Sequence, residues 1–538
     1  MSVKRHRRRI GVVVLGLAYA LAVWWVFTRS TPLIQQRPVT IRFAHWQIER
    51  GPPDGIAAAI KRYEELNPRV HVEQLLIPGA TVYPQWMRSN LAGGTGPDLM
   101  EWGSWLAGQR DIPARYFTPL TAELAKPNPY NKGTSQEGIP WEKTFHDNLL
   151  VPRRDSPEPG QIYAVTISEA TVRLFCNIKL LQQCTGSTAA PTSFDDLRKI
   201  IARIEDYARR TRQPIHALAG SGDNGLWIAE SLFSAPLMGV SRSIDDKGYL
   251  YTYNRDVLAA YLEGRWSYGS PAVSAGLRLV REVTGAMKPG FLQLHRDDAM
   301  LEFFRGEAVF IYTGTWDATS LRRMAPFTVV PMRLPNVLPS DPEVGRYIIG
   351  IGGEGQGETS VAMYLNRYSE HKAEALDFLK FLTSVPGNQL FTDASLWLPS
   401  VNGVKLPEEI KDFRNYQLGH SFGQAPYDII GSEVNGEWKR HFYQLVGEQG
   451  SVKQFATALD EVMPVAIRTD LQNEMRNTLL LVKPQDALIV ANAEMATATP
   501  TDGHYRERQL EMEAGQTMSE GLALQMKLVL DTTTIGKR

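Results

Sequence analysis

The stretch FRGEAVFIYTGTW, residues 304–316, carries a tryptophan to the end of a short apolar strand. Residues 308–312 are apolar and lie between Gly306 and Gly314, which predicts a buried strand that ends in a turn. In open α/β sheets, ligands bind beyond the carboxyl ends of the strands. A tryptophan at such a place can offer its flat face to the C–H side of a sugar ring, so this segment predicts Trp316 as a ligand platform. The alternative for the segment taken alone is a tryptophan of the hydrophobic core.

The length and composition of the chain set its broad class. At 538 residues, the chain exceeds the size at which one hydrophobic core keeps growing, so we expect two globular units with appendages. Lysine plus arginine and aspartate plus glutamate both number 58, so the net charge indicates neither nucleic acid nor an acidic partner. The 10 histidines lack the paired spacing that zinc needs, and we predict no metal and no cofactor.

Two cysteines, Cys176 and Cys184, are too few for a disulfide scaffold or a four-cysteine zinc site. In an oxidising compartment they could form one bridge. The helix expected over residues 178–183 would hold their Cα atoms too far apart for a bridge, so two separate buried thiols are the favoured interpretation.

The first 38 residues are typical of an export or anchoring signal. Residues 1–9 form a basic end, residues 10–27 an uncharged apolar run and residues 28–38 a linker. A basic front keeps that end in the cytoplasm, so the rest of the chain should lie in the periplasm or at the extracytoplasmic face of the membrane. The Trp24-Trp25 pair suits the outer interface of a retained transmembrane anchor, which we favour over a signal peptide cleaved in the small-residue stretch 18–22.

The next segment predicts a β-α-β unit. Residues 39–44 alternate as a strand, residues 55–66 form an amphipathic helix, and residues 70–76 resume the strand pattern. A parallel sheet is the natural product of such a unit. A further helix over residues 83–91 and a third strand over residues 98–102 extend it, and the predicted fold class is therefore α/β.

Later segments are less regular. Residues 127–160 are rich in proline, asparagine and glycine and predict a long surface excursion. Ser193 opens a helix with a capping signature, and residues 371–383 form one amphipathic helix. Past Asp470 the chain is expected to be helical and polar, and no internal repeat is present.

Four segments are informative when they are taken together: FAHW at 43–46, GTGPDLM at 94–100, FRGEA with GTW inside 304–316, and KAEALDFLKFLT at 372–383 followed by Leu398-Pro399. In this order and spacing they resemble the extracellular solute-binding proteins of sugar ABC importers, the group that includes maltose- and glycerol-phosphate-binding proteins. The resemblance covers roughly residues 39–470. Each segment is only moderately specific, and the order of all four carries the resemblance.

The resemblance implies two α/β lobes joined by crossing hinge strands, with the ligand clamped between the lobes by hinge closure. The first crossing would fall near residues 163–166 and the return near residues 348–352. Residues 471–538 lie outside the resemblance and form a helical C-terminal extension of unknown role, which could pack on a lobe, pair with another chain or stay mobile. The implied lobe boundaries are 39–161 and 349–410 for lobe I, and 162–348 and 411–470 for lobe II.

A sugar site needs aromatic planes for the ring faces and polar groups for hydroxyls that lose their water. The resemblance implies such groups at strand ends and in loops that face the cleft. Trp227 resembles the aromatic residue that the family supplies from its second lobe, whereas Asp223 is explained equally well by an Asp-Asn-Gly turn. The candidate ligand-binding residues are Trp46, Glu101, Trp102, Asp223, Trp227, Trp316, Gly352 and Trp397.

Residues 350–355, GIGGEG, fit a dinucleotide-binding fingerprint, but they do not predict a nucleotide site. Residues 360–365, which follow, predict a strand, so no helix N-terminus is there to hold a phosphate. A glycine-rich hinge or a cleft-lining loop around Gly352 is the better interpretation.

These features predict a protein that captures a carbohydrate in an interlobe cleft and presents it to the permease subunits of an ABC importer, without catalysis. The alternative class is a carbohydrate-active enzyme that uses Glu101 and Asp223 as a carboxylate pair, which requires carboxyl groups roughly 5 to 9.5 Å apart. A third alternative is a receptor that reports its ligand to a signalling partner through the residues after Asp470.

Overall fold

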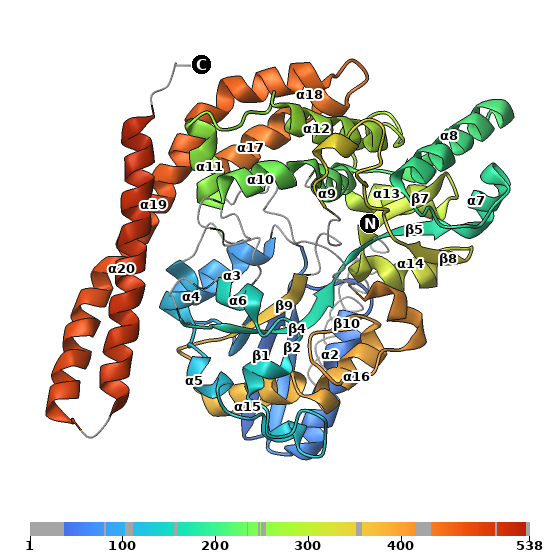
Figure 1. Ribbon diagram of the computed structural model, residues 1–538. Coiled ribbons are helices and arrows are strands. Elements are labelled where there is room, and N and C mark those ends of the chain that lie inside the picture. Colours follow the sequence, from blue (N-terminus) through green and yellow to red (C-terminus); the bar gives the residue numbers. More distant parts are fainter. Residues whose placement is uncertain are drawn as a thin grey trace, which may run out of the picture.

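The chain forms two α/β lobes, one above the other in Figure 1, with a long pair of helices beside them. The predicted anchor at residues 10–27 and the segment around Gly352 lie outside the described residues. No helix in the described ranges combines the length and the apolar character that a membrane span requires. This computed structural model describes residues 37–79, 82–102, 111–154, 156, 160–233, 235–245, 248, 254–350, 358–414, 432–500 and 503–533.

The sheet of lobe I has the strand order β10-β4-β9-β3-β1-β2. β1 pairs in parallel with both β2 and β3, so the predicted parallel arrangement is confirmed for these three strands. β9 pairs antiparallel with β3 and β4, which makes the whole sheet mixed. The strands are Val39–His45 (β1), Val70–Leu76 (β2), Leu99–Glu101 (β3), Ala164–Ala170 (β4), Glu358–Leu365 (β9) and Leu398–Pro399 (β10).

Helix α2, Pro52–Leu66, shows why the first unit folds as the sequence predicts. A proline at the first helical position loses no hydrogen bond there, because the first N–H groups of a helix have no partner within it. Ile56, Ala59, Ile60 and Tyr63 recur every three or four residues and form one buried face against the sheet. The other α-helices of lobe I are Val82–Ala92 (α3), Asp111–Tyr116 (α4), Thr121–Leu124 (α5), Leu150–Arg154 (α6), Lys372–Leu382 (α15) and Val385–Ser395 (α16).

The segment 127–160 is not the simple surface excursion that its composition predicts. Two short 3-10 helices, Pro129–Asn131 (η2) and Trp141–Thr144 (η3), punctuate it. Trp141 and Phe145 lie in the core of lobe I and are fully buried. Single large aromatic side chains anchor this segment, and such anchors leave no helical or strand periodicity in the sequence.

The sheet of lobe II has the strand order β6-β7-β5-β8, and every residue of β7 is buried, which confirms the predicted strand. Its strands are Val172–Asn177 (β5), His216–Ala219 (β6), Ala308–Gly314 (β7) and Val329–Met332 (β8). Its α-helices before β9 are Ile178–Thr185 (α7), Phe194–Thr211 (α8), Gly222–Phe233 (α9), Met238–Ile244 (α10), Asn254–Leu262 (α11), Pro271–Thr284 (α12), Arg296–Phe304 (α13) and Ala318–Met324 (α14).

Two local predictions in lobe II are confirmed. Ser193 caps α8, since its Oγ accepts a hydrogen bond from the backbone N–H of Asp196 at 3.1 Å. Cys176 in β5 and Cys184 in α7 are both free and buried, as two separate thiols.

One extended segment carries the chain from lobe I to lobe II. β4 belongs to the first sheet and β5 to the second, and only Thr171 separates them. The sequence placed this crossing near residues 163–166, and the lobe boundary at 161, but the residues of β4 pair with β9 in lobe I as far as Ala170. The strand-like run continues through residues 164–177 with no glycine, proline or other turn signal, so the sequence does not mark where one sheet ends. The remaining boundaries stay predictions.

The C-terminal region is helical, as expected, but its long helix begins well before Asp470. Helix α19, Val452–Ala498, starts at a Ser451 cap, and its first turns bury Phe455, Leu459 and Met463 in the core of lobe II. Helix α20, Gly503–Thr532, returns alongside it as a hairpin that extends past the lobes (Figure 1). The short elements before the hairpin are Glu408–Phe413 (η8), Ser432–His441 (α17) and Tyr443–Val446 (α18).

Candidate functional site

The carboxyl end of β7 leads into a 3-10 turn, Thr315–Asp317 (η6), that lies against the crossing between the lobes. The backbone N–H of Thr315 donates to the carbonyl of Thr171 at 2.7 Å, and the N–H of Thr171 donates to Oγ1 of Thr315 at 3.2 Å. Both residues are buried. These bonds fix the turn, and Trp316 within it, at the junction of the two sheets.

Trp316 is half-buried and packs against apolar residues of both lobes. Its ring lies over Gly314, where a Cβ atom would overlap the indole. Trp227 of α9 meets the ring edge-to-face, with centroids 5.3 Å apart. The indole Nε1–H of Trp316 has no hydrogen-bond partner among the described residues. The side chain therefore combines an apolar face with an unpaired donor at the lobe junction.

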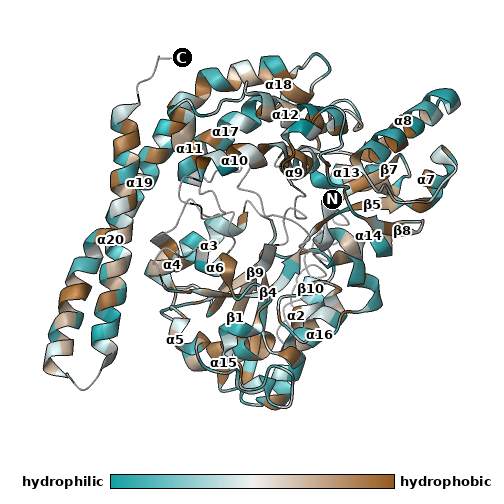
Figure 2. Ribbon diagram, in the orientation of Figure 1, coloured by the Kyte–Doolittle hydropathy of each residue, from teal (hydrophilic) through white to brown (hydrophobic). Residues whose placement is uncertain are grey.

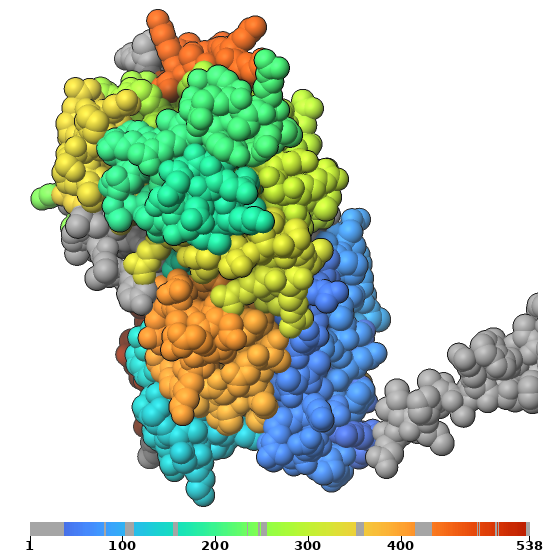
Figure 3. Space-filling view, turned by 90° about the vertical axis from the view of Figure 1, so that its right-hand side faces the viewer, coloured from blue at the N-terminus to red at the C-terminus, as the bar shows by residue number. Residues whose placement is uncertain are grey.

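An ionic cluster spans the two lobes beside Trp316. Glu49, in the loop after β1, accepts a hydrogen bond from Nη2 of Arg296 at 2.8 Å, and this Nη2 lies 3.7 Å from Oδ1 of Asp317. Oγ1 of Thr313 donates to Asp317 at 2.6 Å. Because Glu49 follows a strand of lobe I and the others belong to lobe II, the Glu49–Arg296 pair bridges the lobes. In Figure 3 the yellow part of lobe II lies directly on the blue and orange parts of lobe I.

The cluster is shielded from solvent. The side chains of Glu49 and Asp317 are 9% and 4% exposed. Burial raises the pKa of Asp317, and the positive charge of Arg296 opposes that shift. Oε2 of Glu49 is buried without a hydrogen-bond partner among the described residues. Such an oxygen is costly to leave unpaired, and a hydroxyl donor would satisfy it.

Sequence reasoning missed this cluster, because its residues form no motif. The available signal was position: Glu49 follows β1 and Asp317 follows Trp316, so both stand just beyond the carboxyl ends of strands. Arg296, at the start of α13, carried no such signal.

On the lobe I side, Glu101 at the end of β3 holds the loop that follows β1. Its Oε1 accepts from Nε2 of Gln47 at 2.7 Å, and its Oε2 accepts from the backbone N–H of Trp46 at 3.2 Å. The hydroxyl of Tyr83 donates to the Glu101 carbonyl at 2.8 Å. Burial raises the pKa of Glu101 to about 8, against the effect of the two hydrogen bonds. Trp46 itself is half-buried.

Residues 51–389 match the family model of bacterial extracellular solute-binding proteins. The chain belongs to this family. The match covers more than half of the chain and confirms the resemblance drawn from the four segments. No curated protein is similar enough to count as a relative.

Solved structures show the same fold for this solute-binding protein. A chitin oligosaccharide binding protein is 17% identical, with a TM-score of 0.55 over 80% of this chain and 98% of the other. RafE in complex with raffinose is 14% identical, with a TM-score of 0.54 over 80% and 99%. Maltose-bound MalE3 of T. maritima is 17% identical, with a TM-score of 0.53 over 79% and 99%. The two-lobed α/β fold is therefore confirmed, and the solute-binding family makes the chain a binding protein and not an enzyme.

The structure brings two pairs of predicted site residues together: Trp227 with Trp316, and Trp46 with Glu101. Two others lie within the cores. Trp102 is 5% exposed and packs beside Phe117, and Trp397 is 3% exposed in the core of lobe I. Gly352 lies outside the described residues. A role for each of these residues in binding stays a prediction.

Asp223 is exposed at the start of α9, while its neighbour Asn224 is buried and donates from Nδ2 to the Tyr312 carbonyl at 2.8 Å. Asn224 thus ties α9 to β7 and positions Trp227. Glu101 is 2% exposed, and its carboxylate accepts a hydrogen bond from Gln47. It therefore does not face Asp223 across an open cleft, as the carboxylate pair of a glycoside-cleaving enzyme would.

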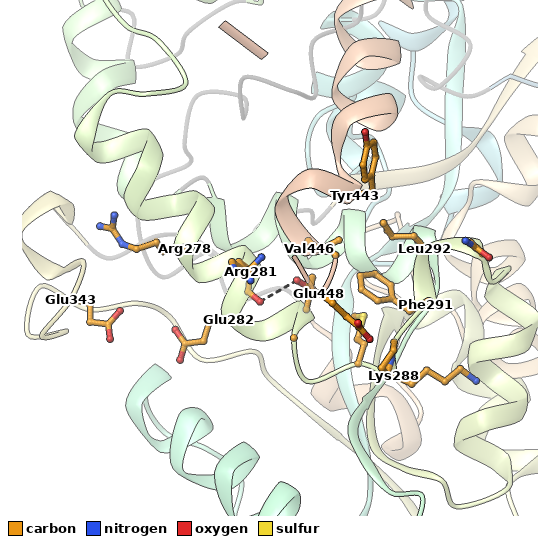
Figure 4. A pocket seen from close by; sticks show the side chains of 17 residues that line it. Arg278, Arg281, Glu282, Lys288, Phe291, Leu292, Glu343, Tyr443, Val446 and Glu448 are labelled. Carbon is orange, nitrogen blue, oxygen red and sulfur yellow. Dashed lines mark hydrogen bonds between the residues drawn. The ribbon is translucent and has the colours of Figure 1, made fainter. Parts of the chain in front are cut away.

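A cavity of about 800 Å³ lies elsewhere in lobe II (Figure 4). It opens between the end of α12, residues 284–293 and α18. Arg281, on its wall, donates to the carbonyl of Leu445. None of the predicted site residues lines it, so size alone does not identify the sugar site.

Proposed function

We propose that this solute-binding protein captures a carbohydrate between its two lobes and delivers it to an ABC-type importer. The observation that carries the proposal is the indole of Trp316, edge-to-face with Trp227, at the point where both lobes meet. Neighbours of the same fold are described with chitin oligosaccharide, raffinose and maltose, which supports a sugar as the solute.

In this proposal, the ligand is held by two kinds of contact. The rings of Trp316 and Trp227 cover apolar faces of the sugar. Oε2 of Glu49 and the indole N–H of Trp316, both unpaired among the described residues, accept from and donate to hydroxyl groups. Because Glu49 belongs to lobe I and Trp316 to lobe II, a ligand that engages both stabilises the closed arrangement of the lobes.

We also propose that residues 10–27 anchor the protein in the membrane, with the basic residues 1–9 in the cytoplasm and both lobes on the extracytoplasmic face. The charge pattern of the sequence supports this orientation. An anchor keeps the binding protein near the permease. Carbonate extraction of membranes tests the anchor: the full-length chain should stay in the membrane fraction, and release into the soluble fraction would contradict it.

A thermal-shift panel tests carbohydrate binding. Maltose, raffinose and chitotriose are each added to the purified protein, and the true ligand class should raise the free energy of unfolding by about 2.7 kcal/mol at 100 times its dissociation constant. Mannitol at the same concentration is the control for nonspecific effects of polyols. The proposal is wrong if no mono- or oligosaccharide shifts the melting temperature beyond this control.

A further inference from the structure

Most of the C-terminal hairpin lies beyond the part of the chain that resembles solute-binding proteins, which ends near residue 470. The family match ends at residue 389, and the related structures are covered almost completely, to 98% or more, by about 80% of this chain. The hairpin of α19 and α20 adds a surface that sugar capture does not require. Figure 2 shows apolar (brown) patches along both helices where they extend past the lobes.

Helix α20 carries apolar or small residues on two opposite faces. The inner face packs against α19 and includes the buried residues Ala523, Met526 and Val529. The outer face carries a stripe that is spaced by four, three, four, three and four residues, which is the heptad spacing of a helix that pairs with another helix. This outer stripe consists of Leu510, Ala514, Thr517, Gly521, Leu524 and Leu528, and all six are exposed.

The three leucines of the outer stripe are far from buried. Leu510 is 49% exposed, Leu524 is 68% exposed and Leu528 is 61% exposed. A helix that is apolar on both faces is normally covered on both, since contiguous exposed apolar surface marks an interaction site. Within the described residues, α19 covers only the inner face.

We propose that the outer stripe pairs with the same stripe of a second copy of this chain, with the two α20 helices antiparallel. In this register Leu510 of one copy lies opposite Leu528 of the other. Ala514 lies opposite Leu524, and Thr517 lies opposite Gly521. Large residues therefore meet small ones on either side of the centre, which lets the two helices approach closely.

The charges beside the stripe agree with this register. Arg506 comes within one residue of level with Asp531 of the second copy, and Glu513 within two residues of level with Lys527. Each end of the pair thus carries two opposite-charge pairs, while Glu520 lies near its own counterpart at the centre. Salt bridges at such flanking positions favour one orientation over the other.

The same charges disfavour a membrane as the partner. Helices that lie on anionic membranes are rich in lysine and arginine on their polar face. Helix α20 has more acidic than basic residues: Glu507, Glu511, Glu513, Glu520 and Asp531 against Arg506, Arg508 and Lys527.

The stripe is short, about 27 Å from Leu510 to Leu528. We therefore expect modest affinity in dilute solution and stronger pairing where the chains are concentrated by tethering. The proposal does not depend on sugar binding, because no residue of the candidate site takes part in it.

Cysteine crosslinking in the full-length chain tests the register. Chains with Ala514→Cys and one tag are produced together with chains that carry Leu524→Cys and a second tag. Cys176 and Cys184 are buried and do not compete. Mild oxidation should link the two variants to each other. Each variant produced alone should link poorly, since its two cysteines would lie ten residues, or about 15 Å, apart. Efficient linkage of each variant to itself, or no linkage at all, overturns the proposal.

Disruption of the stripe gives a second readout. The detergent-solubilised full-length protein should have the mass of a dimer at high concentration, and Leu524→Glu should reduce it to a monomer with unchanged circular dichroism. The matched control is Leu488→Glu, because Leu488 is 52% exposed on α19 and lies outside the stripe. The proposal fails if both variants lose the dimer equally or if the unmodified chain is a monomer. It also fails if Leu524→Glu abolishes binding to phosphatidylglycerol vesicles and leaves the mass unchanged.

Discussion

At Gly314 the absence of a side chain allows the indole of Trp316 to lie directly on the backbone. Any larger residue there would push the ring out of its place between the lobes. This close approach explains why a glycine ends the buried strand, because the glycine sets the position of the ring as well as the turn. The pair Gly314 and Trp316 thus acts as one unit in the proposed site.

Replacement of Trp316 by alanine should weaken sugar binding at least tenfold while it costs less stability than loss of a core tryptophan. The reason is that Trp316 is half-buried, whereas Trp141 is fully buried in lobe I. Isothermal titration with the sugar identified by the thermal-shift panel measures the first effect. Trp141→Ala is the matched control and should lower the free energy of unfolding by about 3–5 kcal/mol. If Trp316→Ala binds the sugar normally but loses as much stability as Trp141→Ala, Trp316 is a core residue and not a ligand contact.

Glu101 should make stability fall as the pH rises from 6.5 to 8. Its folded-state pKa of about 8 lies above the ordinary glutamate pKa of 4.5, so the folded protein holds a proton that the unfolded chain has released. The resulting stability is fully present below the unfolded pKa and is lost as the pH rises through 8. Burial also lowers the pKa of His45 from 6.5 to about 4, so the unfolded chain still binds part of a proton there at pH 6.5 and this group adds a small opposite slope just above pH 6.5. Comparison with a Glu101 variant separates the two effects.

The expected slope from Glu101 is at most ~1.4 kcal/mol per pH unit. Urea unfolding at pH 6.5, 7.25 and 8 measures it, and Glu101→Gln should remove it because a glutamine keeps the shape of the protonated acid. Identical slopes for both proteins would show that Glu101 titrates normally.

At the level of elements, the sequence predicts what periodicity and local chemistry determine. The β1-α2-β2 unit, the Ser193 cap and the buried strand β7 all follow from patterns within a few residues. The crossing at Thr171 does not, because β4 and β5 form one extended run without a turn signal and only their partners in space differ. The Glu49–Arg296 pair joins residues 247 apart in sequence and has no local pattern.

We expect the hydrogen bonds of Asp460 to stabilise the packing of α19 on lobe II. Its carboxylate accepts from the hydroxyl of Tyr261 at 2.9 Å, from the N–H of Tyr268 at 2.9 Å and from the N–H of Gly269 at 3.1 Å. Asp460→Ala leaves these donors without that partner, so we expect a loss of about 1–3 kcal/mol and faster amide exchange in the first turns of α19. Asp486→Ala is the control, since Asp486 is exposed and its one hydrogen bond among the described residues is accepted from Gln516. If the amide exchange rates of α19 are unchanged in Asp460→Ala, apolar packing alone holds the helix on lobe II.

For the whole molecule, the contact between Glu49 and Arg296 matters most, because it is an ion pair from one lobe to the other. A second bond beside it, from Oγ1 of Thr319 to the carbonyl of Ser395 at 3.0 Å, also joins lobe II to lobe I. These contacts hold the lobes in the arrangement that the structure shows, and rotation of the lobes away from each other would break them.

Glu49→Gln should shift the unliganded protein towards an open arrangement. The variant loses one charge of the pair that bridges the lobes, while Asp317 still faces Arg296 from its own lobe. Small-angle scattering without ligand should show a larger radius of gyration than for the unmodified protein. Glu302→Gln is the control, because Glu302 pairs with Lys288 within lobe II at 3.4 Å and should leave the radius unchanged. Equal radii for all three proteins would show that the ion pair does not hold the lobes together.

Because the first turns of α19 are buried in lobe II, the hairpin is expected to move with that lobe and to amplify its rotation. A helix of 47 residues is at most about 70 Å long, so each degree by which lobe II rotates about the base of the helix moves its far end by up to roughly 1 Å. A small closure of the sugar cleft would thus become a displacement large enough for a neighbouring molecule to sense. Spin labels placed near residue 495 of α19 and on α5 in lobe I would report this motion, and their separation should change when ligand is added.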